Sequence, residues 1–225
     1  MHRDNGWIPA FAGMTGFAAL SDTITIGERS FIMNIKDFRK PEHNIDEIVI
    51  NRWSPRAMSG EVVEKTKLLS LFEAARWAPS SNNNQPWRFI YGRRNTKSWT
   101  TFFNLLDEGN QEWAKNAAML IVVISKTTFD NGKNARTHTY DAGAAWENFA
   151  LRGSLMGLVV HGMQGFDYDK AKEVLRIPDG YKVEAMIAVG KKGKKEDLPQ
   201  YLQEREFPSA RKNLSEITME GIFKG

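Results

Sequence analysis

Apolar residues recur every three to four positions in several stretches of the chain after Met33, which predicts amphipathic helices. These stretches cover residues 44–51, 59–78, 102–106, 137–157 and 169–175. In the second stretch, Ser59 is the expected N-cap and Pro79 ends the helix. Its predicted buried stripe consists of Val62, Leu68, Leu69, Phe72 and Ala75.

Four apolar runs between these helices predict the strands of a sheet. Ala117–Ser125 is apolar on both faces, so we expect it to be central in a sheet that is covered on both sides. Gly157–Met163 is predicted to be a second central strand. The other two runs are Pro86–Tyr91 and Val183–Val189. Residues 33–225 are therefore predicted to form a single domain.

Residues 1–32 do not share this pattern. They contain four glycines and a loose apolar stretch from Trp7 to Leu20. Proline and glycine interrupt that stretch and an aspartate offsets the early arginine, so the segment does not look like a secretory signal. We interpret residues 1–32 as an appendage outside the core, with Met33 as the natural first residue of the domain.

The composition is that of a soluble globular chain, with 41% hydrophobic and 26% charged residues. The longest apolar run, residues 117–124, is too short to span a membrane. The absence of cysteine excludes disulfides, thiolate catalysis and cysteine-ligated metals, and it fits a cytoplasmic location. The net charge of +4 permits an anionic ligand. Nucleic acid is not expected as a partner, because the lysines are mostly scattered.

The polar loop within Ala78–Phe89 joins a predicted helix to a predicted strand. Between Pro79 and Pro86 it consists of Ser, Asn and Gln, which offer uncharged donors and acceptors. The prolines stiffen the loop, and Asn tolerates the left-handed backbone that tight loops need. Such a loop suits a flat heteroaromatic ligand. An ordinary connection is the alternative, since loops are generally rich in these residues.

Arg52, Ser54 and Arg56 follow the first predicted helix. Guanidinium groups fork onto phosphate oxygens and a hydroxyl adds a donor, so the three residues are typical of a phosphate clamp. Two ordinary surface arginines are the alternative interpretation. The four histidines lack the spacing of a metal site, so no metal is expected.

The predicted helix over residues 137–157 carries many small side chains. Small residues in a soluble helix commonly serve core packing, but a run this dense also favours a helix–helix seam in a dimer. The chain beyond Pro199 has little regular period, and we interpret it as an arm that wraps a partner subunit. The small residues are Ala142, Gly143, Ala144, Ala145, Ala150 and Gly153.

Five short motifs occur in a distinctive order and spacing along the chain. Together they make it resemble the nitroreductase family of FMN flavoproteins over nearly all of Ile45–Phe223. The motifs are Arg52-x-Ser54-x-Arg56, Pro79-Ser80 with Asn83 and Gln85-Pro86-Trp87, Asn110-x-x-Trp113, Asp141-x-Gly143-Ala144-x-x-Glu147-Asn148, and Ser209-x-Arg211-Lys212.

The resemblance implies an α+β protein with a three-layer α/β/α fold and a central mixed sheet. It also implies an obligate homodimer that holds FMN tightly at its interface. Arg52, Ser54, Arg56 and Arg211 would hold the ribityl phosphate, Ser80 and Asn83 would line the flavin ring and the ribityl chain, and Asn110 would bond the pyrimidine side. Backbone amides near Gln164 and Gly165 would face the reactive edge of the ring. Trp53, Pro79 and Gln85 complete the expected cofactor-binding set.

The same resemblance implies an NAD(P)H-dependent oxidoreductase in which the cofactor carries the chemistry and no side chain is the catalyst. NAD(P)H would give hydride to flavin N5 and leave, and a small organic acceptor such as a nitroaromatic or a quinone would then use the same slot in a ping-pong cycle. The chain has no G-x-G-x-x-G fingerprint, which agrees with a nicotinamide that only visits. A flavin-binding carrier or sensor without turnover is the alternative.

Two positions depart from the family pattern. Trp53 stands where many members carry a basic residue, which removes one charge from the clamp. Trp113 replaces a lysine that some members place near N1 and O2 of the flavin, which weakens stabilisation of the reduced, anionic ring. Residues 1–32 have no counterpart in the family.

Overall fold

The computed structural model of the protein describes residues 22–26, 29–33 and 35–224. The chain divides into two compact units, Met1–Met33 and Asn34–Gly225. In the first unit, β1 (Asp22–Ile26) and β2 (Arg29–Met33) pair as an antiparallel hairpin. The apolar stretch from Trp7 to Leu20 lies outside the described residues, and the interpretation of residues 1–32 as an appendage stays a proposal.

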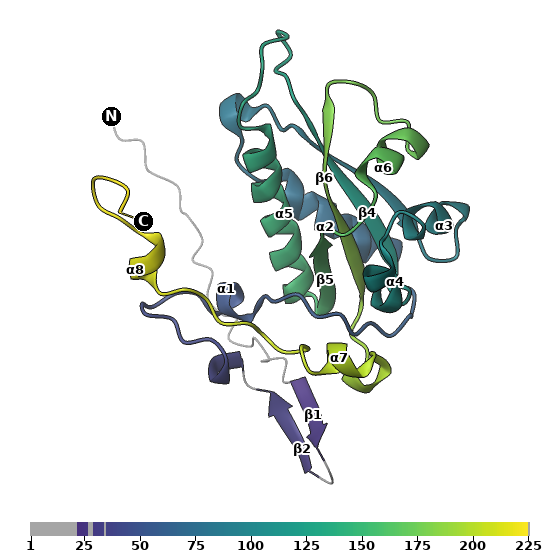
Figure 1. Cartoon of the computed structure of the whole chain (residues 1–225), viewed down its shortest axis with the longest axis vertical. Helices are drawn as coiled ribbons and strands as arrows, with labels where there is room; N and C mark the ends of the chain where they lie inside the picture. The colour runs from purple at the N-terminus through teal and green to yellow at the C-terminus, as the bar shows by residue number, and fades with distance from the viewer. Residues whose placement is uncertain (1–21, 27–28, 34, 225) are drawn as a thin grey trace, which may run out of the picture. The chain divides into compact units, whose positions relative to one another are not determined.

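The second unit contains a sheet of four strands in the order β3-β4-β6-β5 (Figure 1). Each neighbouring pair is antiparallel, so the predicted mixed sheet is wrong for the described strands. The register gives the reason: Arg93, where β3 ends, lies opposite Met119, where β4 begins, so the intervening chain returns to the same end of the sheet. The strands are β3 (Trp87–Arg93), β4 (Met119–Lys126), β5 (Leu158–Met163) and β6 (Tyr181–Lys191).

The predicted central position of residues 117–125 is confirmed. All of these residues are buried, and β4 lies between β3 and β6. The prediction for β5 is wrong, because this strand lies at an edge of the described sheet and β6 is the second inner strand. The edge position agrees with the exposure of Gly162 and with a half-buried His161 near the end of β5.

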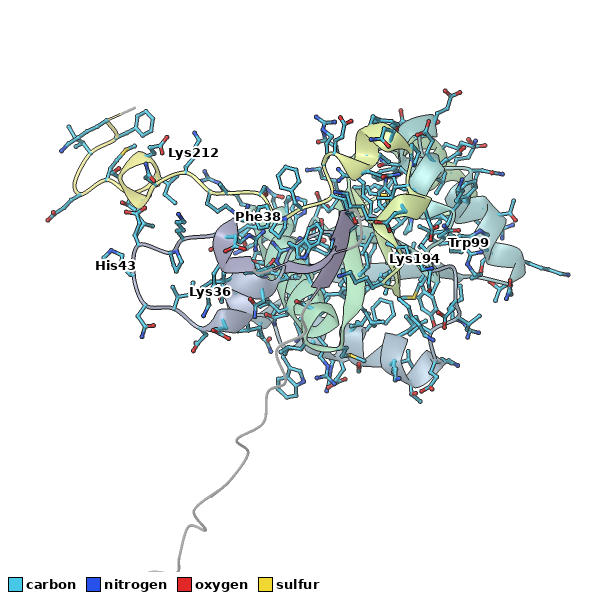
Figure 2. The ribbon with its side chains drawn as sticks, turned by 90° about the horizontal axis from the view of Figure 1, so that it is seen from below. Lys36, Phe38, His43, Trp99, Lys194 and Lys212 are labelled. Carbon is cyan, nitrogen blue, oxygen red and sulfur yellow. The ribbon has the colours of Figure 1, made fainter. Side chains whose placement is uncertain are left out.

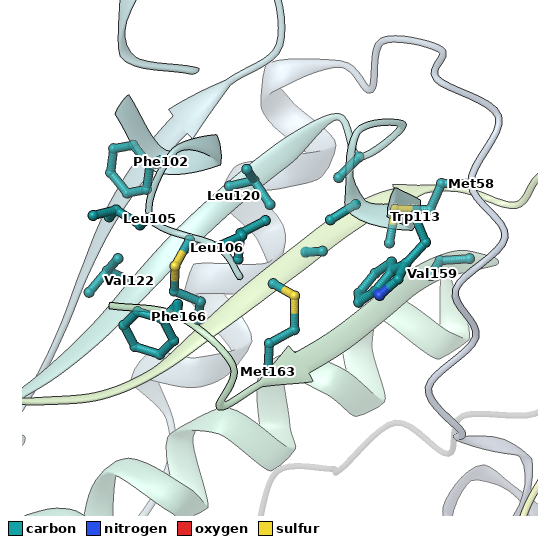
Figure 3. Close-up of a cluster of buried hydrophobic side chains, with 14 of the residues drawn as sticks. Met58, Phe102, Leu105, Leu106, Trp113, Leu120, Val122, Val159, Met163 and Phe166 are labelled. Carbon is teal, nitrogen blue, oxygen red and sulfur yellow. The ribbon is translucent and has the colours of Figure 1, made fainter. Parts of the chain in front are cut away.

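Helices cover both faces of the sheet, which confirms the predicted three-layer architecture. Residues of β4 alternate between two hydrophobic clusters: Met119, Ile121 and Val123 face one layer, whereas Leu120, Val122 and Ile124 face the other. Figure 3 shows the second cluster, in which Leu120 and Val122 lie near Phe102 and Leu105. The first layer contains α2 (Lys65–Arg76) and α5 (His138–Leu155), and the second contains α3 (Lys97–Phe103), α4 (Glu108–Ala114) and α6 (Tyr168–Val174) (Figure 1).

Short helices occupy the two ends of this unit. No helix among the described residues has both the length and the apolar character needed to cross a bilayer. The short elements are α1 (Glu47–Asn51), α7 (Gln200–Gln203), α8 (Leu214–Ile217) and the 3-10 turns η1 (Ile35–Asp37), η2 (Ser81–Asn83) and η3 (Lys195–Asp197).

Helix α2 starts later than predicted. Ser59 is not its N-cap, because the Ser59 amide donates to the Lys191 carbonyl and holds this segment beside the end of β6. The helix begins at Lys65, and its buried residues are Leu68, Leu71 and Ala75. Two members of the predicted stripe, Val62 and Leu69, are exposed.

The small residues of α5 serve the core of their own chain. Ala142, Ala145 and Ala150 are buried in the first layer, so these three residues serve core packing, and the dimer seam stays a prediction. A Cβ added to Gly153 would overlap the Val160 side chain of β5, so glycine is required for this close approach. Gly143 differs, since a Cβ there would meet nothing within 4 Å.

Two glycine substitutions on α5 test this packing. Gly153→Ala should lower the free energy of unfolding by about 1–3 kcal/mol, because the added methyl overpacks the contact with Val160. Gly143→Ala is the matched control and should raise stability by up to about 1 kcal/mol through helix propensity alone. Urea denaturation of both variants checks this, and equal effects would contradict the assigned packing.

Candidate functional site

A cavity of about 610 Å³ lies between α5, the ends of β5 and β6, and the segment after α1. This volume is within the range of small-molecule and cofactor sites. Its walls combine aliphatic and aromatic surface with a few polar groups, as such sites commonly do. The lining residues are Arg52, Ser54, Val123, Thr139, Ala142, Gly143, Trp146, Glu147, Gly162, Met163, Gln164, Glu184, Ala185 and Ile187.

Arg52 and Ser54 form a polar end of the cavity. Helix α1 stops at Asn51, and Arg52 follows with an extended backbone. The Arg52 guanidinium forms an ion pair with Glu147 of α5 (Nε to Oε1, 3.2 Å) and donates to the Ser54 hydroxyl at 3.4 Å. The structure thus brings together two of the three predicted clamp residues on one wall.

Arg39 joins this end of the site, and no motif in the sequence marks it. Its Nη1 donates to the carbonyls of Ile50 and Arg52, at 2.6 Å each, and its Nε donates to the Ser209 carbonyl at 3.2 Å. Burial, followed by the charges of Arg211 and Arg52, lowers the pKa of Arg39 to about 10. Arg39, Arg52 and Arg211 therefore place positive charge where an anion would be stabilised.

Arg56 has a different environment from Arg52, and its side chain does not line the described cavity. Its neighbour Pro55 accepts a hydrogen bond from Nδ1 of His161 at 2.9 Å. Burial, with a contribution from the Arg56 charge, lowers the pKa of His161 to about 4. The neutral imidazole therefore donates its Nδ1–H to the Pro55 carbonyl. This bond fixes residues 52–56, the clamp segment, to β5.

The C-terminal segment holds the same part of the chain from another direction. Glu206 is buried, and its Oε1 accepts from the backbone amides of Arg56 at 2.7 Å and Ala57 at 2.9 Å. The next residue, Phe207, stacks on Phe38 with ring centroids 5.7 Å apart, and Figure 2 shows Phe38 beside this segment. Arg211, further along, is exposed and donates to the hydroxyl of Ser209.

The polar loop has the left-handed backbone that its asparagines permit. Asn82 and Asn83 have φ of 50° and 52°, and Gln85 adopts φ of 47°. The Ser80 hydroxyl accepts from the Gln85 amide at 3.0 Å and closes the turn. The loop is thus a fixed structure that presents its outer side chains.

Asp141 connects this loop to α5. Its buried carboxylate accepts from the Ser81 amide at 3.2 Å and from the Thr137 hydroxyl at 3.3 Å. These contacts give a structural role to the aspartate of the Asp141–Asn148 motif. The described cavity wall does not include Pro79, Ser80, Asn83, Gln85 or Trp53.

Asn110 lies beside the loop that follows β5. Its Nδ2 donates to the Gly165 carbonyl at 2.9 Å, and its Oδ1 accepts from the buried Trp113 indole at 3.2 Å. A Cβ on Gly165 would overlap Asp107, so only glycine fits this approach. The arrangement places Asn110 and Gly165 next to Gln164, which lines the cavity.

The structure therefore gathers part of the predicted set around one cavity. Arg52, Ser54 and Gln164 line it, and Asn110 and Gly165 pack behind Gln164. The sequence reasoning assigned no role at the site to Arg39, Trp146 or Glu184. The Asp141–Asn148 motif pointed to the part of α5 that contains Trp146, but no pattern marked Arg39 or Glu184.

Comparison with known proteins relates this geometry to a family. The model of the nitroreductase family matches residues 49–98 and 93–191, which is more than half of the chain. The chain belongs to the nitroreductase family. The predicted resemblance is thereby confirmed.

Individual relatives agree with this assignment. A crystal structure described as an oxidoreductase containing FMN is 46% identical, covers 83% of this chain and 96% of its own, and has a TM-score of 0.80. The "Putative NADH dehydrogenase/NAD(P)H nitroreductase" of Parabacteroides distasonis is 27% identical over 78% of this chain and 97% of its own, with a TM-score of 0.63. An uncharacterized 15.4 kDa protein of Mycolicibacterium smegmatis is 32% identical over 60% of this chain and 95% of its own.

The contact between Glu206 and the clamp segment can be tested through stability. Glu206→Ala leaves the buried amide of Ala57 and the partly buried amide of Arg56 without an acceptor, so it should lower the free energy of unfolding by about 2–4 kcal/mol. Glu204→Ala, at an exposed position two residues earlier, is the control and should change stability by less than about 0.5 kcal/mol. Chemical denaturation measures both, and an equally small effect of the two substitutions would refute the role of Glu206.

Proposed function

We propose that this chain is an FMN-dependent oxidoreductase that passes electrons from NAD(P)H to a small organic acceptor such as a nitroaromatic or a quinone. One observation carries the proposal: the cavity joins an arginine-rich end to an apolar wall of Val123, Met163 and Ile187. FMN has the matching two parts, a phosphate dianion and a flat heteroaromatic ring. The FMN named for the 46% identical relative supports the same cofactor here.

The proposed phosphate site uses Arg52 and Ser54 directly. Arg52 already faces Ser54 across the cavity end, and both offer N–H or O–H donors to phosphate oxygens. Arg211 contributes its charge from the C-terminal segment, and Arg39 holds the Arg52 backbone in place. Glu147 gives Arg52 a partner that a phosphate can replace or share.

The proposed ring site lies along α5 and the end of β5. A Cβ added to Gly143 would meet nothing within 4 Å. A Cβ added to Gly162 would meet only the Trp146 ring, whose nearest atom would lie at 3.1 Å. These two glycines allow a flat ligand to approach the backbone closely. Gln164 and Gly165 offer backbone groups at the edge of that surface. When bound, FMN supplies the hydride chemistry, while these residues orient it and limit water access.

We propose a homodimer because the polar loop contributes nothing to the described wall of its own cavity. The loop is nevertheless rigid and presents amide and hydroxyl groups, as a cofactor contact requires. Ser80 and Asn83 would then complete the site of a partner subunit. The same arrangement leaves the C-terminal segment free to extend over that subunit.

Cofactor affinity tests the proposed clamp. Arg52→Ala should weaken FMN binding by about 10- to 100-fold, because one charge-assisted hydrogen bond contributes about 1.5–3 kcal/mol. Arg56→Ala should have a smaller effect, since its side chain does not line the cavity. Fluorescence titration measures both, with Arg136→Ala, at an exposed position before α5, as the control. Wild-type affinity in Arg52→Ala would remove the clamp from the proposal.

Turnover kinetics test the enzymatic activity. Anaerobic NADH or NADPH should bleach the bound flavin, and steady-state double-reciprocal plots should be parallel, because one slot serves donor and acceptor in turn. Bound FMN that neither nucleotide reduces would identify a carrier or sensor instead. Intersecting lines would show separate donor and acceptor sites.

A further inference from the structure

Glu184 reaches the cavity because of an irregularity in the sheet. In the pairing of β4 with β6, Val123 lies opposite Ala185 and Ile124 lies opposite Val183, so Glu184 is left over as a β-bulge. Regular alternation would place Glu184 and Ala185 on opposite faces. The bulge instead lets both residues line the same cavity, and bulges commonly redirect a side chain beside an active site.

A directed chain of hydrogen bonds ends on this carboxylate. The Ser125 hydroxyl lies 2.5 Å from Oε1 of Glu184 and 2.6 Å from Nδ1 of His138. A serine hydroxyl has one proton, and an ionised carboxylate can only accept, so Ser125 donates to Glu184. His138 therefore donates its Nδ1–H to Ser125. The direction of donation runs from His138 through Ser125 to Glu184.

His138 and Glu184, the two ends of this series of hydrogen bonds, differ in whether they line the cavity. Ser125 is fully buried, whereas the His138 and Glu184 side chains keep 14% and 12% of their surface accessible. Glu184 is part of the cavity wall, but neither His138 nor Ser125 lines it. A proton can therefore enter from solvent at His138 and reach the cavity at Glu184 along these hydrogen bonds. This path does not need free water in the cavity.

We propose that His138, Ser125 and Glu184 form a proton relay that delivers a solvent proton to the electron acceptor in the cavity. This inference rests on the proposed function, because only an acceptor that is reduced needs the proton. Glu184 is the donor to the acceptor, and Ser125 and His138 position and reload it. The acceptors that fit are quinones and other carbonyl-type oxidants, which take up a proton on oxygen.

The stoichiometry of the proposed reaction requires such a proton. NAD(P)H, one H⁺ and a quinone give NAD(P)⁺ and a hydroquinone, and the transferred hydride supplies only one of the two added hydrogens. In the relay, Ser125 first passes its proton to the Glu184 carboxylate and takes one from His138, which water reprotonates. The new Glu184 O–H bond then breaks as the acceptor O–H bond forms, and Glu184 returns to its ionised form.

Other polar groups around Glu184 are compatible with this role. Thr139 of α5 donates to Oε1 at 2.9 Å, and Lys182 of β6 lies 3.5 Å from Oε2. Burial, and then the charge of Glu184, raises the pKa of Tyr168 of α6. Its hydroxyl therefore stays protonated at neutral pH and does not compete for the relayed proton.

Separate measurement of the two half-reactions tests the relay in full-length, FMN-loaded protein. Ser125→Ala removes the shortest bridge from His138 to Glu184 and leaves only longer contacts, through Thr139 (3.4 Å from Nδ1) and direct (Nδ1 to Oε1, 3.5 Å). Glu184→Gln keeps the shape of the side chain but cannot carry the proton. In both variants, flavin reduction by NAD(P)H should stay within about two-fold of wild type, whereas reoxidation by a benzoquinone should slow by 10-fold or more. Ser70→Ala, which removes a hydroxyl from α2, is the control and should leave both half-reactions unchanged.

Chemical rescue separates proton delivery from a structural effect. In Ser125→Ala and Glu184→Gln, imidazolium buffer should accelerate reoxidation in proportion to its concentration, whereas wild type should not respond. In addition, proton NMR of the full-length protein without donor or acceptor should show a hydrogen-bonded His138 Nδ1–H signal that Ser125→Ala abolishes. This readout does not depend on turnover.

The outcomes distinguish the relay from the proposed function. Failure of NAD(P)H to reduce the wild-type flavin would overturn the proposed function and the relay with it. Normal flavin reduction with wild-type reoxidation in both variants would overturn the relay alone. Slow reoxidation without buffer rescue, or a His138 signal that persists in Ser125→Ala, would also overturn it, because either result makes the cluster structural.

Discussion

The close packing of α5 on the sheet is the constraint on which the rest of the structure depends. At its C-terminal end, Gly153 lets the helix touch Val160, and the buried alanines continue this contact toward the N-terminus. Trp146 packs against the same cluster and also lines the cavity. One helix therefore closes the core at one end and forms a wall of the site at the other. A larger side chain at Gly153 would move both.

Arg52, paired with Glu147, lies at one end of the cavity and Glu184 lies on another wall, and this separation would let one site serve the two proposed roles. Arg39, Arg52 and Arg211 concentrate positive charge without a carboxylate partner for each, which suits a tightly held phosphate. Glu184 lies on the wall formed by β6, where a second anion would be repelled. In the proposed function, the arginines bind the cofactor at one end of the cavity, and Glu184 supplies a proton to the acceptor at the other.

The sequence predicted the layers and part of the cavity wall, because those features depend on local pattern. The apolar run of residues 117–125 marks a central strand wherever its partners lie, and Asn82 and Asn83 adopt the left-handed backbone that their side chains tolerate. Strand direction and the edge position of β5 depend on pairing between distant segments, which periodicity does not encode. Arg39 and Glu184 were missed for the same reason: one acts through the backbone of residues 50–52 and the other through a bulge in register.

The segment of residues 52–56 is held mainly through its backbone, so its position does not depend on the side chain of Trp53. Arg39 binds the carbonyl of Arg52, His161 binds the carbonyl of Pro55, and Glu206 binds the amide of Arg56. These contacts fix the backbone without help from Trp53. Burial, and then the charges of Arg211 and Arg52, lowers the pKa of Arg39. A bound phosphate, as proposed, would offset the charges of Arg52 and Arg211 at a segment whose backbone these contacts already hold.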